Sequence, residues 1–143
     1  MLFPKKVKFR KWHTARKSTS KRAATVTRGA DLQMGSHGLR AVGQARVTSN
    51  NIESARKVLT REIGKYGKYW IRVFPDRPLT KKAAEVGMGS GKGDPYVFCV
   101  DIRPGRVIFE VGNVSDQIAR EALRKAGSKL PITTNIVSTT DVK

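Results

Sequence analysis

Seven residues in the second half of the chain carry the pattern closest to a phosphate-binding loop: Gly87-Met88-Gly89-Ser90-Gly91-Lys92-Gly93. A P-loop requires glycine five residues before its Gly-Lys pair and Ser or Thr directly after it. This chain has Val86 and Gly93 at those two places. The G-x-G-x-x-G dinucleotide pattern also fails, because the sixth residue counted from Gly87 or Gly89 is not glycine. No helical pattern follows the loop, so nucleotide chemistry is not predicted.

The same loop suits contact with an RNA backbone. Its alternating glycines let backbone amides approach a surface closely, and Lys81, Lys82 and Lys92 surround them with positive charge. Amides and ammonium groups both bind phosphate. A flexible linker is also glycine-rich, but it does not need the lysines. The residues predicted to make this contact are Lys81, Lys82, Met88, Gly89, Gly91, Lys92 and Gly93.

The first 28 residues contain ten Lys or Arg and no acid. Such a segment cannot bury itself, because unpaired buried charges are costly. It requires a polyanion, and a phosphate backbone releases counterions when it is neutralised. Two aromatic residues in it, Phe9 and Trp12, either dock the arm on its own domain or stack on bases. The residues predicted to bind RNA, in this arm and beyond it, are Lys5, Lys6, Lys8, Arg10, Lys11, Trp12, His13, Arg16, Arg40, Arg56, Arg72 and Arg77.

Catalytic and metal-binding patterns are missing from the sequence. The chain has two histidines, His13 and His37, one cysteine, Cys99, and scattered acids. These residues give no ligand set at a recognisable metal spacing, no nucleophile–base pair and no carboxylate pair for acid–base chemistry. We therefore predict that the protein is not an enzyme and that it uses no cofactor.

Composition favours a nucleic-acid-binding protein of the cytoplasm. The 143 residues carry a formal net charge of +18, which is the usual electrostatic footprint of such proteins. The single cysteine excludes an intramolecular disulfide, and its apolar neighbours from Tyr96 to Val100 predict a buried thiol. No apolar run approaches the length of a membrane span, and no apolar segment follows the basic N-terminus as in a secretory signal.

The apolar pattern predicts two helices. The first begins at Thr48-Ser49-Asn50-Asn51, a cluster of N-cap residues. Its apolar stripe consists of Ile52, Ala55, Leu59, Ile63 and Tyr66. Gly64 and Gly67 are expected to end this helix. The opposite face holds Arg56, Lys57, Arg61 and Lys65, which are either solvated or in contact with RNA. A second helix is predicted from the N-cap Ser115 to Gly127, and its apolar stripe consists of Ile118, Ala119, Ala122, Leu123 and Ala126.

The strand signals lie around these helices. Residues 31–47, 68–74, 96–102, 107–111 and 131–137 have β-like patterns. Residues 78–95 read as a long loop, and Arg103-Pro104-Gly105-Arg106 reads as a hairpin turn. The order predicts an α+β domain over 29–143 with a mixed or antiparallel sheet, preceded by a basic extended arm over 1–28.

Five segments resemble, in order, the family of the bacterial-type large-subunit ribosomal protein numbered sixteen. They are Pro4–His13, Gly35–Gly43, Gly67–Pro78, Met88–Gly93 and Leu130–Thr134. Two features depart from the family. Residues 14–28 are longer and richer in Ser, Thr and Lys than the usual connector, and Gly87 stands where bacterial members usually carry arginine. A contact or modification that depends on that arginine is not carried over.

The resemblance implies a hammerhead-like α+β fold and a structural role in the large ribosomal subunit, bound to 23S-type ribosomal RNA. It implies that the arm from Lys5 to Arg16 threads ribosomal RNA. It also implies that Lys81, Lys82 and Gly87–Gly93 reach toward the peptidyl-transferase region, where the family shapes the aminoacyl-tRNA site. The expected partners are ribosomal RNA, A-site tRNA with P-site tRNA as a further candidate, and other large-subunit proteins, but not DNA or membrane. The expected location is the cytoplasmic ribosome, with an organellar ribosome left open.

Three other functions are weighed against this one. A free RNA chaperone or regulator has the same electrostatics, but it needs more exposed aromatic residues for stacking. A nucleotide-dependent enzyme would have to use the Gly-rich loop, which lacks the required pattern. Binding to double-stranded DNA lacks support, because no helix-turn-helix or zinc module is recognisable.

Overall fold

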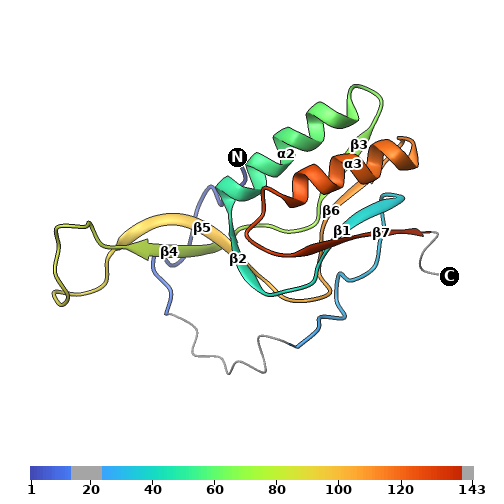
Figure 1. Cartoon of the computed structure of the whole chain (residues 1–143). Coiled ribbons are helices and arrows are strands. Elements are labelled where there is room, and N and C mark those ends of the chain that lie inside the picture. Colours follow the sequence, from blue (N-terminus) through green and yellow to red (C-terminus); the bar gives the residue numbers. More distant parts are fainter. Residues whose placement is uncertain (14–23, 140–143) are drawn as a thin grey trace.

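The computed structural model describes residues 1–13 and 24–139. In this part of the chain it contains two helices and seven strands, an α+β fold as predicted (Figure 1). The elements are β1 (His37–Ala41), β2 (Ala45–Thr48), α2 (Ser49–Ile63), β3 (Lys68–Ile71), β4 (Arg77–Lys81), β5 (Asp94–Ile102), β6 (Val107–Gly112), α3 (Asp116–Gly127) and β7 (Thr134–Ser138).

The helices cover one face of a four-stranded antiparallel sheet with the order β3-β6-β1-β7. α3 packs on β1, β6 and β7, while α2 packs on α3 and reaches β3 (Figure 1). The largest side chains enclosed between these layers include Leu39, Ile52, Leu59, Phe109 and Leu123. Burying such side chains is the main stabilising contribution to a domain of this size.

α2 confirms most of the predicted helix. Thr48 accepts a hydrogen bond from the amide of Asn51, and the Asn51 side chain accepts one from the amide of Thr48, which completes a capping box. The helix ends at Gly64, whose φ of 70° is in the region that favours glycine. The prediction for Tyr66 was wrong, because this residue follows the helix and is 90% exposed.

α3 packs through small side chains, which let it approach the sheet closely. Ala119, Ala122, Leu123 and Ala126 are buried. The predicted stripe also included Ile118, which is 44% exposed. Ser115 stands at the N-cap position, but its side chain makes no capping hydrogen bond.

The other face of the four-stranded sheet is covered by residues 29–36, here called the strap. The amide of Val107 donates to the carbonyl of Gly29 at 3.0 Å, and the amide of Thr139 donates to the carbonyl of Ser36 at 2.9 Å. Within residues 31–47, predicted to be strand-like throughout, the strands cover only 37–41 and 45–48. The strap forms no strand because its amides bond to a side chain, as described below.

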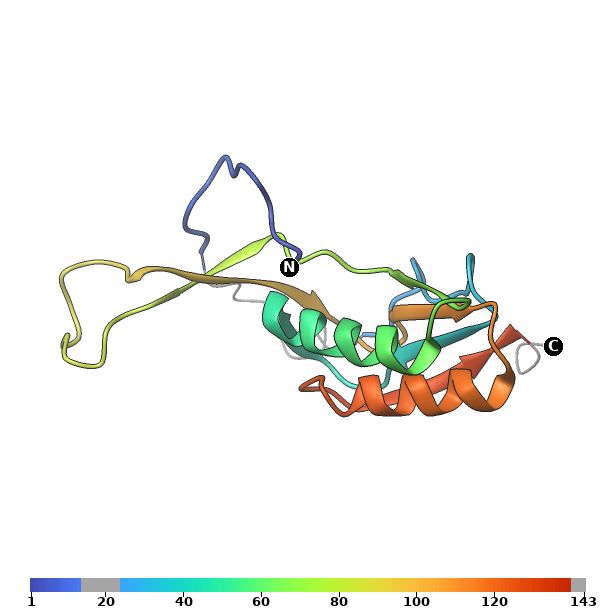
Figure 2. The same ribbon diagram turned by 90° about the horizontal axis from the view of Figure 1, so that it is seen from above.

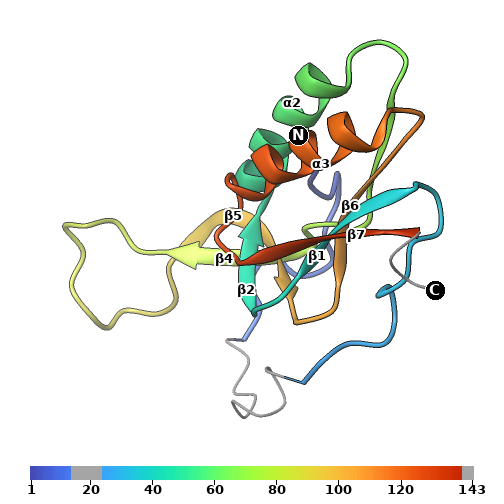
Figure 3. The ribbon, with the colours of Figure 1, turned by 45° about the vertical axis from the view of Figure 1, so that its right-hand side comes forward.

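A second antiparallel sheet has the order β2-β5-β4. β4 and β5 run beyond the helices as a two-stranded ribbon joined by residues 82–93, here called the hairpin (Figures 1 and 3). The prediction of a loop over 78–95 was therefore wrong at both ends. Pro78 is in β4 and Pro95 is in β5; β4 is an edge strand, where proline is tolerated because one side of the strand forms no ladder.

The turn from Arg103 to Arg106 is present, but it does not form a hairpin. Gly105 has a φ of 90°, and the amide of Arg106 donates to the carbonyl of Arg103 at 3.3 Å. The strands on either side, β5 and β6, belong to different sheets. The turn is thus a corner between sheets, and the predicted sheet is two sheets. β3 also ends at Ile71 and β7 begins at Thr134, so both are shorter than predicted at those ends.

In the described ranges, no helix combines the length and the apolar character that crossing a membrane would require.

Candidate RNA interface

The hairpin presents glycines, lysines and one methionine at its tip. Gly89, Ser90 and Gly91 all have positive φ, with values of 103°, 55° and 89°. Met88 is fully exposed. The Lys82 ammonium donates to the carbonyls of Gly87 and Gly89, so the backbone of the tip curves around this ammonium group. The predicted loop residues therefore lie together at one end of the molecule.

Two features at the base of the tip stabilise this arrangement: a cation–π contact and the close approach of the two strands. The Lys81 ammonium lies 5.5 Å from the centre of the Tyr96 ring, a cation–π distance. A Cβ at Gly93 would lie 2.6 Å from the carbonyl oxygen of Lys81, so only glycine fits where the two strands begin to pair. The close approach of the two strands therefore explains the glycine at position 93 without any contact with RNA.

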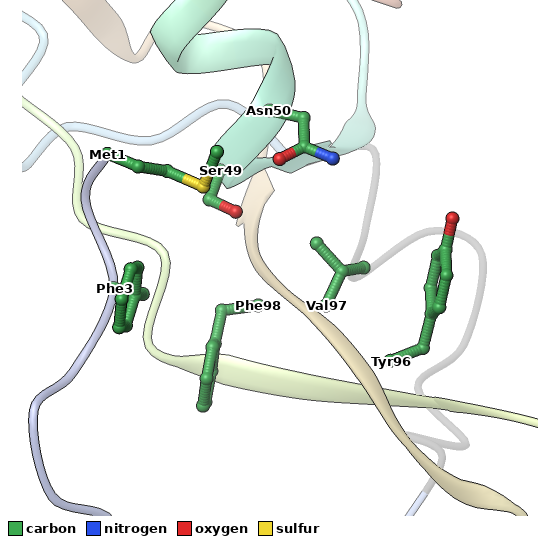
Figure 4. Close-up of a pocket in the computed structure, with 7 residues that line it drawn as sticks. All are labelled: Met1, Phe3, Ser49, Asn50, Tyr96, Val97 and Phe98. Atoms are coloured by element: carbon green, nitrogen blue, oxygen red, sulfur yellow. The ribbon is translucent and has the colours of Figure 1, made fainter.

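The arm is anchored to the second sheet at its beginning. The rings of Phe3 and Phe98 stack with centroids 6.5 Å apart and planes 8° from parallel. Leu2 packs against the core. Met1, Phe3 and Phe98 line an open pocket of about 240 Å³ beside Ser49 and Asn50 at the start of α2 (Figure 4). Sequence reasoning missed this anchor, although Met1-Leu2-Phe3 is a run of three apolar residues at the start of the arm.

A second anchor, here called the clasp, joins the arm to the hairpin. The Lys11 ammonium donates to the carbonyl of Lys92 at 3.0 Å and lies 3.6 Å from the Asp94 carboxylate. The Lys92 ammonium donates in return to the carbonyl of Trp12. Arg77 of β4 donates to the carbonyl of His13 at 3.3 Å. The two predicted contact regions, far apart in the sequence, therefore lie side by side.

Between the two anchors, residues 4–10 form an arc that stands away from the body (Figure 2). Lys5, Lys6, Lys8 and Arg10 are all exposed on it. Phe9 and Trp12 are 60% and 40% exposed, so the docking is made by Leu2 and Phe3 instead. Arg16 and most of the 14–28 connector lie outside the described residues.

The four predicted arginines of the domain differ in what they contact. Arg56 binds Glu53 at 2.6 Å, Arg77 binds Asp101 at 2.6 Å, and Arg72 binds Glu110. Arg40 is exposed and pairs with no side chain in the described ranges. Three of the four thus have a partner within the fold.

Glu110 explains how the strap is held. Its side chain is fully buried in β6. It accepts hydrogen bonds from the amides of Met34 at 2.7 Å and Gly35 at 2.8 Å, and from Gln33. Burial alone would raise the pKa of Glu110, but these amides and Arg72 hold it below its usual value. Arg72 therefore has a structural partner within the fold, and its contact with RNA stays a prediction.

Glu53 and Arg56 form a second strong pair, on α2. The hydrogen bond from Arg56 lowers the pKa of Glu53 to about 2, against some opposition from burial. Arg56 also donates to the Tyr69 hydroxyl at 3.3 Å. These contacts tie α2 to β3 and leave Arg56 partly buried.

One group of side chains could suggest acid–base chemistry. His37 Nε2 lies 2.7 Å from Asp116, and His37 Nδ1 lies 2.9 Å from the Ser36 hydroxyl. Hydrogen bonds from His37 and Arg120 lower the pKa of Asp116. The group joins β1 to the first turn of α3, and His37 is buried. Across residues 1–13 and 24–139, no three His, Cys, Asp or Glu side chains gather in a way that could hold a metal.

Comparison with known proteins tests the resemblance over the whole length. A family model described as ribosomal protein L16p/L10e matches residues 4–137. The chain belongs to the ribosomal protein L16p/L10e family. A "Large ribosomal subunit protein uL16" from Afipia carboxidovorans is 50% identical over 138 residues, which are 96% of this chain and 97% of that protein. A protein of the same name from Rhodopseudomonas palustris is 49% identical over the same coverage.

The L16p/L10e match takes in the arm from residue 4, the strap, the hairpin and both helices. The identification drawn from five short segments is therefore confirmed. The chain and its two relatives are nearly equal in length, so the similarity concerns the whole of each relative and not one module.

Proposed function

We propose that this protein is a structural constituent of the large ribosomal subunit, located in the cytoplasm, which binds ribosomal RNA and takes part in translation. Family membership over residues 4–137 supports this role, and both relatives carry names of large-subunit proteins. The net charge of +18 suits a protein whose partner is a polyanion. Its role is to position RNA and not to catalyse a reaction.

The finer proposal concerns the arm and the hairpin. The arc carries four exposed cations, Lys5, Lys6, Lys8 and Arg10, and the clasp holds it beside the hairpin. This juxtaposition is the observation that carries the proposal, because one RNA surface can reach both segments. The arm binds 23S-type ribosomal RNA, and the hairpin tip extends past it to A-site tRNA, with P-site tRNA as a further contact.

The shape of the tip fits a tRNA contact. The three positive-φ residues next to Met88 turn the backbone sharply, and a Cβ at Gly87, Gly89 or Gly91 would meet nothing within 4 Å. Open backbone of this kind lets amides approach a sugar-phosphate surface. Lys81, Lys82 and Lys92 supply charge at its base.

The coarse proposal is tested by sedimenting a lysate that contains the tagged chain through sucrose gradients. We expect the chain to travel with the large subunit at moderate salt and to leave it only at high salt, because phosphate contacts weaken as salt rises. A chain that stays at the top of the gradient at moderate salt would contradict a ribosomal role and would favour a free RNA chaperone.

The finer proposal needs a local probe. A photo-crosslinking amino acid is placed at Met88, and the matched control carries it at Lys129, beyond the end of α3. We expect crosslinks to tRNA from position 88 in ribosomes with a filled A site and none from position 129. Crosslinks to ribosomal RNA alone from position 88 would remove the tRNA contact and leave the coarse proposal standing.

A further inference from the structure

The outer side of α2 and the turn after it carry a row of cations that the fold does not neutralise. Lys57, Arg61 and Lys65, here called the α2 row, follow one another at intervals of four residues and are all exposed. No side-chain hydrogen bond or ion pair joins any of them to a residue of the described ranges, although the charge of Lys57 acts on Glu53 through space. Lys57 and Arg61 lie one turn apart, about 6 Å along the helix axis.

The two acids of α2 are occupied elsewhere. Glu53 binds Arg56 at 2.6 Å, on the side of the helix that meets β3. Glu62 binds Lys125 of α3 at 2.8 Å, on the side that meets the other helix. Both carboxylates of the helix thus bind cations at its two flanks, and no carboxylate of the helix binds the row between them.

α3 provides the contrast within the same molecule. Its exposed arginines Arg120 and Arg124 are also four residues apart. Arg120 lies 3.0 Å from Asp116, and Arg124 lies 3.0 Å from Glu121. Basic residues on the outside of a helix are therefore matched with acids on α3 and left unmatched on α2.

Tyr66 is a second and independent observation at the same place. It stands one residue after Lys65, in the turn that Gly64 opens with a φ of 70°. Its side chain is 90% exposed, well above the intermediate burial that is usual for tyrosine. An exposed aromatic ring at the end of a row of cations is the arrangement that stacks on an unpaired base while the cations bind phosphates.

We propose that the α2 row and Tyr66 bind a second RNA segment, with Lys57, Arg61 and Lys65 on the phosphates and Tyr66 stacked on one unpaired base. The proposal rests on the RNA-binding role proposed above and adds a surface to it. This surface lies at the far end of the body from the hairpin tip, because α2 runs away from the hairpin toward the turn before β3 (Figure 1). The protein would then join two RNA segments across its length.

The test measures the affinity of the full chain for 23S-type ribosomal RNA transcribed in vitro, by filter binding over a series of salt concentrations. The variant is Lys57→Gln with Arg61→Gln, and the matched control is Arg120→Gln with Arg124→Gln, which removes the same charge at the same spacing. We expect the variant to lower the slope of log affinity against log salt by about two and the control to leave it unchanged. Circular dichroism establishes that both variants keep their helices.

Tyr66 is tested separately. We expect Tyr66→Leu to weaken binding about tenfold and Tyr66→Phe to preserve it, because stacking needs a ring and not a hydroxyl. An unchanged slope in the α2 variant would overturn the inference while the wild type still binds. Equal losses in the variant and its control would also overturn it, since they would show a response to total charge alone.

Two further outcomes separate this inference from the proposed function. If the wild-type chain does not bind ribosomal RNA, both fail. If the α2 variant binds RNA normally but no longer sediments with the large subunit, the row meets an acidic protein surface and its assignment to RNA is wrong.

Discussion

The two sheets of this protein are built from the same kinds of strand but differ in what covers them. In the four-stranded sheet, every residue of β6 is buried, because the helices lie on one face and the strap lies on the other. In the three-stranded sheet, β5 begins with three exposed residues and becomes buried only toward its end. The first sheet forms the stable body, and the second turns into a ribbon that leaves it (Figure 2).

The charges follow the same division. In the body, Glu110, Glu53, Glu62 and Glu121 each bind a neighbouring cation. On the arc, Lys5, Lys6, Lys8 and Arg10 face solvent with no acid among them. These acids of the body are thus paired within the fold, although the α2 row and Arg40 are unmatched in the described ranges. The arc has no acid at all and presents charge that only an outside polyanion can neutralise. Four predictions test this difference between the body and the arc.

The largest effect is expected from Glu110→Gln in the body. This change leaves Arg72 without its buried charge partner and weakens the bonds to three strap amides. We expect it to lower the free energy of unfolding by about 3–5 kcal/mol in urea titrations. The control is Glu121→Gln on the exposed side of α3, which should change that free energy by less than ~0.5 kcal/mol. Equal losses in the two variants would show that the strap does not depend on Glu110.

The next largest effect compares two glycines. A Cβ at Gly35 of the strap would lie 2.5 Å from the Val111 carbonyl oxygen, and the nearest atoms are all backbone. We expect Gly35→Ala to lower the free energy of unfolding by roughly 1–3 kcal/mol. Gly87→Ala at the hairpin tip meets open space and should cost nothing measurable. A stable Gly35→Ala variant would mean that the strap can lift away from β6 at little cost.

The third prediction concerns acid. The pKa of Glu53 falls from 4.5 to about 2 on folding, and that of Glu110 is lowered as well. Between the two pKa values the unfolded chain binds more protons, so stability rises with pH there. The contribution is complete above about pH 4.5 and is lost as the pH falls toward 2. Urea titrations at several pH values should show this loss, and Glu53→Gln should make it smaller. A loss of the same size in that variant would contradict the assignment.

The smallest effect on stability is expected from Lys92→Met, which removes one contact of the clasp, the hydrogen bond from the Lys92 ammonium to the carbonyl of Trp12. Exposed lysine contacts contribute little, so the free energy of unfolding should change by less than ~0.5 kcal/mol. The arm should nevertheless detach more often, and chymotrypsin should cleave at Phe9 and Trp12 severalfold faster than in the wild type. Lys129→Met is the control. Unchanged cleavage would mean that the anchor at Leu2 and Phe3 holds the arm alone.

Local signals predicted the local structure well. The N-cap cluster at Thr48 and the stripe of Ile52, Ala55, Leu59 and Ile63 predicted α2 nearly to its ends, because capping and amphipathic burial depend on neighbours in the chain. The same holds for the α+β class. Tyr66 fitted the period of the stripe, yet Gly64 had already ended the helix, so its spacing carried no information.

The features that were missed depend on residues far apart in sequence. Residues 31–36 of the strap were predicted to be strand, but amides of the strap bond to the side chain of Glu110, which lies 75 residues after Gly35. Pro78 and Pro95 indicated a loop, but β4 pairs with β5 along an edge where proline is tolerated. For the site, the residue composition was enough to predict the basic arm and the glycine-rich loop. It could not predict that the two segments are in contact at Lys11 and Lys92, which are 81 residues apart.

The lone thiol of Cys99 gives the molecule a built-in reporter. It lies at the centre of the second sheet, opposite Thr48 on one side and Arg77 on the other, and it is fully buried. Burial raises the pKa of the thiol, so a labelling reagent meets little thiolate until the strands separate. The rate at which Cys99 is labelled therefore measures how often the strands of the second sheet separate where the ribbon joins the body. A rate equal to that of global unfolding would mean that the hairpin and the helical body share one cooperative unit, and a faster rate would mean that the ribbon opens while the body stays closed.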